Sequence, residues 1–345
     1  MSSKAKPALR RINLALQGGG AHGAFTWGVL ERFLDEEWLE FAAISGTSAG
    51  ALNAAALKSG LATGGRDGAR AALRALWTRV AGVGDLRAMG WYQRVLPPVG
   101  ALARMAEQMM PVSPADLASR VFSPYDLGPL WRNPLEPVVA AFRHDEVCAK
   151  NGPKLFISAT NVRSGKLRVF AGEEVTNEAI LASACLPTLF RAVEIDGEAY
   201  WDGGYAANPA LFPLYDPALP DDIVIVSINP IRREELPRSA PEILNRINEI
   251  SFNSSLLRDL RAISFVKRLI ADGAVKRGAM KDVLVHMIAD DALMTTLSVR
   301  TKTAPTPLLI ETLRQAGHTA AGSFLEAHAD DLGQRGTLDL AAMFS

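Results

Sequence analysis

The fold of this chain is decided by residues 44–51, which read Ile-Ser-Gly-Thr-Ser-Ala-Gly-Ala. An apolar run that begins at Phe41 enters this stretch, and a run of small helix formers, residues 51–57, leaves it. The central serine has a glycine two residues away on each side, which is the pattern of a sharp turn between a strand and a helix. Such a turn exposes one hydroxyl, so we predict that Ser48 is a nucleophile. Gly46 and Gly50 would leave room for the bend.

The composition is that of an ordinary globular protein. Of the 345 residues, 48% are hydrophobic and 21% are charged, and 37 basic side chains balance 37 acidic ones. Without a net basic charge, we expect no nucleic-acid partner. No apolar run is long enough to span a bilayer and none resembles a secretory signal, so we expect a cytoplasmic protein. Cys148 and Cys185 match no metal spacing and are expected to be reduced.

Two strand–loop–helix units open the chain. The first consists of a strand at 11–16, a glycine loop at 17–23 and a helix at 24–37. The second runs through the serine turn. Successive units of this kind predict an α/β sheet with its working loops at one edge. We expect residues 1–10 to be a flexible tail and residues 11–345 to form a single domain.

The remaining chain is predicted to add helices and hairpins. Residues 60–150 should form a mostly helical insertion, with a glycine-rich loop at 60–68 and helices at 69–80 and 99–110. Its large apolar side chains are more typical of core than of an apolar entrance: Trp91, Tyr92, Val95, Leu96, Met105, Met109 and Met110. Further elements are hairpins (154–160 with 166–170, 193–195 with 199–201), a short helix (177–184) and strands (223–228, 283–288). The C-terminal part, 231–345, is expected to be helical, with helices at 241–272 and 308–325.

The glycine loop at 17–23 has two interpretations. Gly18-x-Gly20-x-x-Gly23 satisfies the dinucleotide-binding fingerprint, which also requires an acidic residue at the end of the second strand. The serine turn occupies that position here. We therefore favour an oxyanion hole, in which the backbone N–H groups of Gly18, Gly19 and Gly20 face a developing negative charge. A purely structural tight turn remains an alternative.

A nucleophilic serine needs a base to accept its proton. Of the five histidines, His286 has the right order for a Ser…Asp…His triad, but a structural histidine in a strand is the better interpretation. Asp202 stands at a predicted strand end, followed by Gly203 and Gly204. A carboxylate in that position could take the serine proton directly, although an Asp-Gly-Gly sequence alone is usually a turn.

Three blocks together resemble the patatin-like phospholipase family. They are residues 17–23 (Gln-Gly-Gly-Gly-Ala-His-Gly), residues 46–50 (Gly-Thr-Ser-Ala-Gly) and residues 202–204 (Asp-Gly-Gly), in that order. Residues 182–187 and the Asn-Pro pair at 208–209 are also similar to the family. The resemblance covers residues 11–60 and 154–230 well and the rest of the chain loosely.

The resemblance implies a three-layer α/β/α fold with a mixed central sheet, and hydrolysis of lipid acyl esters by a Ser–Asp dyad. Carried over, Ser48 is the nucleophile, Asp202 the base, and Gly18, Gly19 and Gly20 the oxyanion hole. No cofactor or metal is implied, and we see no metal-ligand cluster. The expected partner is a lipid or acyl-ester substrate, met at a membrane surface or lipid particle. His22 stands where the family often has Arg or Lys, and His22 could be neutral at pH 7.

Three alternatives remain open at this point. The protein could be a Ser-His-Asp esterase that uses His286, or a dinucleotide-binding protein that uses the loop at 18–23. It could also be a catalytically silent lipid-binding protein.

Overall fold

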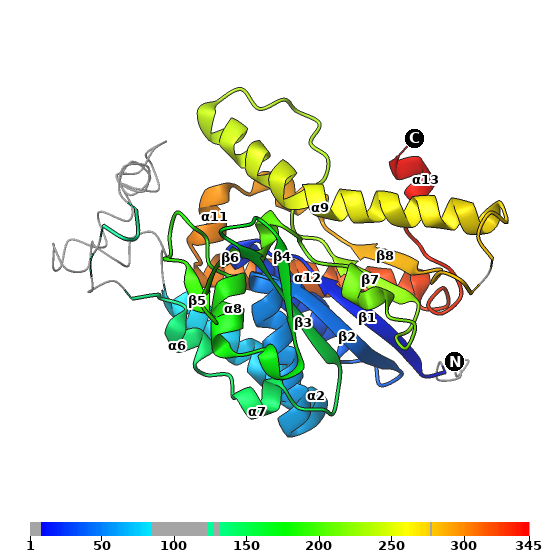
Figure 1. Ribbon diagram of the computed structural model, residues 1–345, viewed down its shortest axis with the longest axis horizontal. Helices are drawn as coiled ribbons and strands as arrows, with labels where there is room; N and C mark the ends of the chain where they lie inside the picture. The colour runs from blue at the N-terminus through cyan, green and yellow to red at the C-terminus, as the bar shows by residue number, and fades with distance from the viewer. Residues whose placement is uncertain (1–7, 84–122, 127, 129–131, 277, 345) are drawn as a thin grey trace.

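A computed structural model describes residues 8–83, 123–126, 128, 132–276 and 278–344 (Figure 1). Within them lies a mixed eight-stranded sheet with the order β5-β6-β3-β2-β1-β7-β8, and β4 pairs with β3. Strands β3, β2, β1, β7 and β8 are parallel, whereas β4, β5 and β6 run antiparallel to their neighbours. The strands span Arg10–Leu16 (β1), Leu39–Thr47 (β2), Lys154–Asn161 (β3), Leu167–Ala171 (β4), Val193–Ile195 (β5), Glu198–Asp202 (β6), Asp222–Val226 (β7) and Leu284–Ile288 (β8).

Helices cover both faces of the sheet, so the three-layer α/β/α architecture is confirmed (Figure 1). Side chains alternate between the two faces of β1: Leu14 packs toward one layer of helices and Ala15 toward the other. This alternation follows from the two-residue period of a strand. The first layer contains α1 (Gly23–Phe33), α2 (Ala49–Val83) and α12 (Pro307–His328), and the second contains α9 (Ala240–Ala271) and α13 (Leu340–Met343).

Helices α1 and α12 pack very closely. A Cβ atom at Gly28 of α1 would lie 1.9 Å from the carbonyl oxygen of Arg314, and one at Gly317 of α12 would lie 1.9 Å from that of Phe25. Only glycine allows two helix backbones to approach so closely. The crossing places α12, the last long helix of the described chain, directly against α1.

The predicted glycine-rich loop at 60–68 is wrong. Helix α2 continues through this segment and loses helical geometry only at Gly64 and Gly65. The two arms on either side of the break touch, because a Cβ atom at Gly60 would lie 2.4 Å from the Cα atom of Ala69. These glycines allow the two arms to pack together. The chain therefore turns at Gly64 and Gly65, and the second arm, which ends at Val83, packs back on the arm that follows Ser48.

Other boundaries differ less from prediction. Strand β1 begins at Arg10, inside the expected tail, and residues 1–7 lie outside the described residues. Helix α1 ends at Phe33 and not at residue 37, because the chain turns there to enter β2. The helix predicted at 99–110 and the apolar residues 91–110 also lie outside the described residues. Both hairpins, the helix at 241–272 and the last strand are confirmed.

Short helices complete the described chain: α6 (Glu136–Val139), α7 (His144–Val147), α8 (Asn177–Ser183), α10 (Asp291–Thr296) and α11 (Val299–Thr303). Only α6 and α7 fall within the described residues of the 123–150 segment, in which we expected mostly helix. Among the helices described here, none combines the length and the hydropathy needed to cross a membrane.

Candidate active site

Ser48 occupies the turn between β2 and α2. Its φ angle is +55°, a left-handed conformation that is uncommon for a residue other than glycine. A Cβ atom at Gly50 would lie 2.1 Å from the carbonyl oxygen of Leu16, so the turn presses directly on the end of β1. The N–H of Ser48 donates to Oγ of Ser183 over 2.9 Å, which ties the turn to α8. This is the geometry of a nucleophile elbow.

Asp202 ends β6 and is fully buried. Its Oδ1 accepts a hydrogen bond of 2.7 Å from the N–H of Gly204. Its Oδ2 has no hydrogen-bond partner among the described residues. Burial raises the pKa of Asp202 to about 7, and the nearby Ser48 hydroxyl and the Gly204 N–H oppose that rise. The Asp202 carboxylate thus lies near the Ser48 hydroxyl, has one oxygen without a partner in the described chain, and is in an environment that favours proton uptake.

The strands explain how Ser48 and Asp202 meet. Strand β3 lies between β2 and β6, and β6 runs antiparallel to both of its neighbours. The register brings the two strand ends together, because Thr47 at the end of β2 lies opposite Ser158 and Asp202 at the end of β6 lies opposite Ala159. Gly203 allows this approach, since a Cβ atom there would lie 2.2 Å from the carbonyl oxygen of Ser158. At Gly204 a Cβ atom would lie 2.5 Å from the ring of Phe252.

The glycine loop lies directly against the serine turn. A Cβ atom at Gly18 would come within 2.6 Å of the Ser48 Cβ. The Gly18 N–H, however, donates to Oδ1 of Asn208 over 2.6 Å, so the expectation that it faces an oxyanion is wrong. The N–H groups of Gly19 and Gly20 form no hydrogen bond with any described residue. These two groups remain as candidate oxyanion donors.

His22 is buried behind the loop and does not carry a charge. Its Nε2 lies 2.7 Å from Oγ1 of Thr301, and its Nδ1 has no partner within the described chain. Burial, together with the positive charge of Lys302, lowers the pKa of His22 to about 3. His22 is therefore neutral at pH 7. The neighbouring Gly23 packs against Ala49, with an added Cβ atom 2.6 Å from the Ala49 Cβ.

A buried polar network under the loop escaped the sequence analysis. Asn229 donates from Nδ2 to the carbonyl oxygen of Gly18 over 2.9 Å. Lys302, from α11, donates from Nζ to Oδ1 of Asn229 over 2.8 Å. Gln17 accepts at Oε1 from the N–H groups of residues 228 and 229. Asn208 lies in a block that resembles the family, but nothing local in the sequence marks Lys302 or Asn229.

His286 is engaged elsewhere. It lies in β8, where Nε2 is 3.0 Å from Oδ1 of Asp222 and Nδ1 is 3.1 Å from Oγ1 of Thr337. Both ring nitrogens are therefore occupied by structural partners. The remaining histidines contact Cys148 (His144), Asp35 (His318) and Asp331 (His328).

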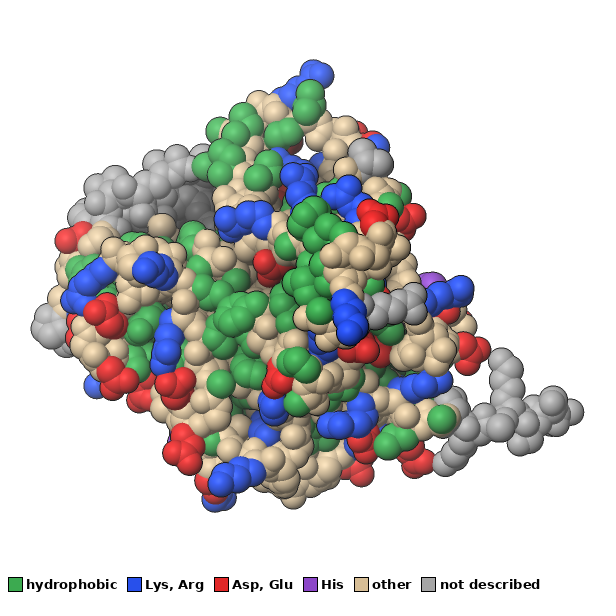
Figure 2. Space-filling model, turned by 45° about the vertical axis from the view of Figure 1, so that its right-hand side comes forward, with side chains coloured by type: hydrophobic (Ala, Val, Ile, Leu, Met, Phe, Trp, Pro, Cys, Tyr) green, Lys and Arg blue, Asp and Glu red, His purple; other side chains and the backbone are tan. Residues whose placement is uncertain are grey.

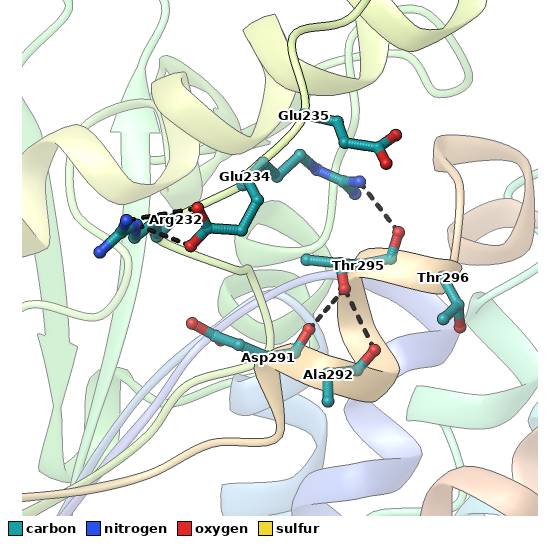
Figure 3. A pocket seen from close by; sticks show the side chains of 8 residues that line it. Arg232, Glu234, Glu235, Asp291, Ala292, Thr295 and Thr296 are labelled. Carbon is teal, nitrogen blue, oxygen red and sulfur yellow. Dashed lines mark hydrogen bonds and ion pairs between the residues drawn. The ribbon is translucent and has the colours of Figure 1, made fainter.

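A polar surface pocket lies next to α10 (Figure 3). Arg232 pairs with Glu234 at its rim, and Arg233 donates to the carbonyl oxygen of Thr295. Its lining contains none of the predicted site residues: Arg232, Arg233, Glu234, Glu235, Asp291, Ala292, Thr295 and Thr296. Its mixed charges give it no clear preference for a ligand of either sign.

The chain is similar to a known protein family and to several solved structures. The structure of VipD from Legionella pneumophila is similar over 95% of this chain and 72% of that one, at 16% identity and a TM-score of 0.43. The type III effector ExoU is similar over 93% of this chain but only 53% of its own, at 17% identity and a TM-score of 0.35. A search of curated proteins found no match. The model of a family described as patatin-like phospholipase matches residues 14–215, more than half of the chain and the part that carries Ser48 and Asp202. The chain therefore belongs to the patatin-like phospholipase family.

Proposed function

We propose that this protein is a serine hydrolase that cleaves lipid acyl esters through a Ser48–Asp202 dyad. Membership of the patatin-like phospholipase family implies lipid acyl hydrolysis. The observation that carries the dyad is the buried Asp202 oxygen without a hydrogen-bond partner beside the Ser48 hydroxyl. A general base with a pKa near the working pH is well suited to proton transfer.

The reaction would proceed in two halves. Oγ of Ser48 attacks the ester carbonyl while Oδ2 of Asp202 takes the hydroxyl proton. The N–H groups of Gly19 and Gly20 stabilise the oxyanion, and the tetrahedral intermediate collapses as the leaving alcohol takes the proton from Asp202. Water then gives a proton to Asp202 and attacks the acyl-enzyme. Collapse of the second tetrahedral intermediate returns that proton to Ser48 and releases the fatty acid.

The alternatives have less support. His286 has both ring nitrogens occupied by Asp222 and Thr337, which leaves neither available to Ser48. A dinucleotide would need an acidic residue at the end of β2, where the serine turn stands instead. The presence of both Ser48 and Asp202 argues against a catalytically silent protein.

The outward face of α9 supports contact with a lipid surface. Its first half exposes four large aliphatic side chains at helical spacing, Ile243, Leu244, Ile247 and Ile250. Figure 2 shows hydrophobic side chains gathered at the top of the molecule, where Figure 1 places this part of α9. The same face continues through Ser251 and Ser254, so it carries no charge until the arginines of the second half. A face of this kind is typical of helices that lie in a membrane interface.

Two arginines favour an anionic lipid as the occupant of this face. Arg258 and Arg261 follow the aliphatic residues on the same side of α9, and within the described chain no ion pair neutralises them. Tyr205 is 48% exposed, and its ring lies 5.7 Å from that of Phe252 in α9. Because Tyr205 follows Asp202 by three residues, the apolar surface continues from α9 toward the catalytic edge.

A fluorophosphonate probe tests the nucleophile. We expect it to label the native protein at Ser48, to leave Ser48→Ala unlabelled, and the variant to release no fatty acid from a lipid panel read by mass spectrometry. Labelling of a different serine would refute the assignment. Folding is checked by an unchanged thermal transition.

Vesicle flotation tests the lipid surface. The double substitution Ile247→Ser and Ile250→Ser should weaken binding to vesicles that contain anionic phospholipid, while hydrolysis of a short water-soluble ester stays unchanged. Leu308→Ser, at a residue that is 79% exposed in α12, is the matched control and should bind like the native protein. Equal flotation of all three proteins would exclude this face of α9.

A further inference from the structure

A buried lysine lies directly behind the glycine loop. The side chain of Lys302 is almost inaccessible, and the carbonyl oxygen of Lys302 would lie 2.2 Å from a Cβ atom at Gly20. Its Nζ donates to Oδ1 of Asn229 over 2.8 Å and to Oδ1 of Asn248 over 3.0 Å. No described carboxylate forms an ion pair with it. Its described hydrogen-bond acceptors are amide oxygens, and burial reduces screening by water. The positive charge therefore acts strongly on the polar groups around it.

Hydrogen bonds link this ammonium to the loop. Asn229 accepts from Lys302 at Oδ1 and donates from Nδ2 to the carbonyl oxygen of Gly18 over 2.9 Å. Asn208 donates to the same carbonyl over 3.2 Å. That carbonyl belongs to the peptide group whose N–H is on Gly19. Donors to a peptide oxygen polarise the whole amide, so its N–H becomes a stronger donor.

The other basic candidate in the loop cannot supply this charge. His22 is neutral, because burial and Lys302 itself lower the pKa of its imidazole to about 3. Lys302 also loses hydration through burial and faces Arg233, whereas Glu249 favours its charged form, and its pKa falls to about 8. Lys302 therefore carries the positive charge behind the loop at pH 7. The ring of Phe252, 5.8 Å from Nζ, closes the other side.

We infer that Lys302 is a positioning residue that acts through Asn229 to hold and polarise the Gly18–Gly19 peptide, strengthening the Gly19 N–H as an oxyanion donor. The inference rests on the proposed hydrolase function. It assigns the charge behind the oxyanion hole to a residue of α11, far from the loop in the sequence. Loss of a whole oxyanion-hole donor costs a factor of about 10² to 10³ in kcat. Weakening one donor should cost less, roughly tenfold.

The test compares Lys302→Met with Lys281→Met on a short water-soluble ester. Lys281 also donates to backbone oxygens, those of Leu214, Asp216 and Leu219, but none of these belongs to the site. We expect Lys302→Met to lower kcat roughly tenfold with KM unchanged, while Lys281→Met keeps the native kcat. An unchanged kcat in Lys302→Met would overturn the inference, and so would an equal loss in both variants.

A pH profile gives a readout that a purely structural role would not move. Native kcat should fall above a midpoint of about 8 as Lys302 loses its proton, and Lys302→Met should lack this alkaline limb. If Lys302→Met does not fold, the pH dependence of native kcat still tests the inference. A native kcat that stays constant between about pH 7 and pH 9.5 would overturn it. Fluorophosphonate labelling of Ser48 in every protein checks the proposed hydrolase function separately, since labelling does not depend on the alkaline limb.

Discussion

Replacing Asp202 with Asn separates the proposed base from its surroundings. Asparagine has nearly the same size, and its amide oxygen can still accept from the Gly204 N–H. It cannot take a proton from Ser48. A positioned base contributes about 10² to 10⁴ in rate, so we expect Asp202→Asn to lower kcat/KM at least about a hundredfold.

The native enzyme should lose activity in acid. Because only ionised Asp202 can accept the serine proton and its pKa is about 7, about a tenth of the enzyme is active at pH 6 and about a hundredth at pH 5. We therefore expect kcat/KM to rise about tenfold per pH unit up to a midpoint near 7. A profile without this limb between pH 5 and pH 7 would refute the assignment of Asp202 as the base.

The same carboxylate should weaken the fold as the pH rises from 3.8 to about 7. Its pKa lies above the ordinary value of 3.8, so the folded state binds more protons than the unfolded chain between pH 3.8 and about 7. The cost of ionisation is absent below pH 3.8, grows through this window and is complete above pH 7. A rise of about three pH units corresponds to about 4 kcal/mol in the free energy of unfolding, as an upper bound.

Urea unfolding at two pH values measures this cost. Relative to the native protein, Asp202→Asn should gain stability at pH 8, by up to about 4 kcal/mol, and gain about half of that or less at pH 5. Comparing the gap between the two proteins cancels the titration of other groups. A gap that is the same at both pH values would show that Asp202 is not held in a proton-binding environment, which would contradict the mechanism.

The other predictions concern stability and the rival base. Gly317→Ala should destabilise the fold by about 2 kcal/mol or more in thermal unfolding, because its Cβ atom would overlap the Phe25 carbonyl. Gly322→Ala in the same helix should gain up to about 1 kcal/mol, because its Cβ atom would meet only Nε of Arg32, at an ordinary contact distance of 3.8 Å. Lys58→Met should lower the free energy of unfolding by about 2 kcal/mol, since Nζ of Lys58 donates to three carbonyl oxygens at residues 149, 151 and 153; a loss below 0.5 kcal/mol would refute this. His286→Ala should keep near-native esterase activity per folded molecule but unfold at lower temperature, because buried Asp222 keeps only the Gly333 N–H as a partner of its Oδ1; total loss of activity would restore the triad.

Motifs with local chemistry could be predicted from the sequence. The serine turn, the glycine loop and the Asp-Gly-Gly strand end each place their special residues within a few positions. Their conformations follow from close backbone contacts that only glycine permits, as at Gly18 and Gly50. The alternation and helical spacing of apolar residues are also local signals, and they predicted most strands and the long helix α9.

Contacts between distant segments could not be predicted in this way. The engagement of the Gly18 N–H depends on Asn208, and the charge behind the loop comes from Lys302, whose neighbours in the sequence carry no pattern. The loop predicted at 60–68 was wrong because its glycines, which usually indicate a loop, here permit two helical arms to touch. The glycine content of a segment indicates that its backbone has conformational freedom. Only the folded structure shows whether that freedom serves a loop or a close contact between helices.

The contact between α1 and α12 bears on how the protein is made. Helix α1 leaves the ribosome well before α12, yet Gly28 lies against the backbone of α12, which is completed only at residue 328. Until then the buried side chains Phe25 and Leu30 lack part of their cover. Apolar surface exposed in this way attracts chaperones and promotes aggregation. A nascent chain that stops before α12 would therefore leave apolar side chains of α1 exposed. Helix α1 is fully covered only after synthesis has passed α12.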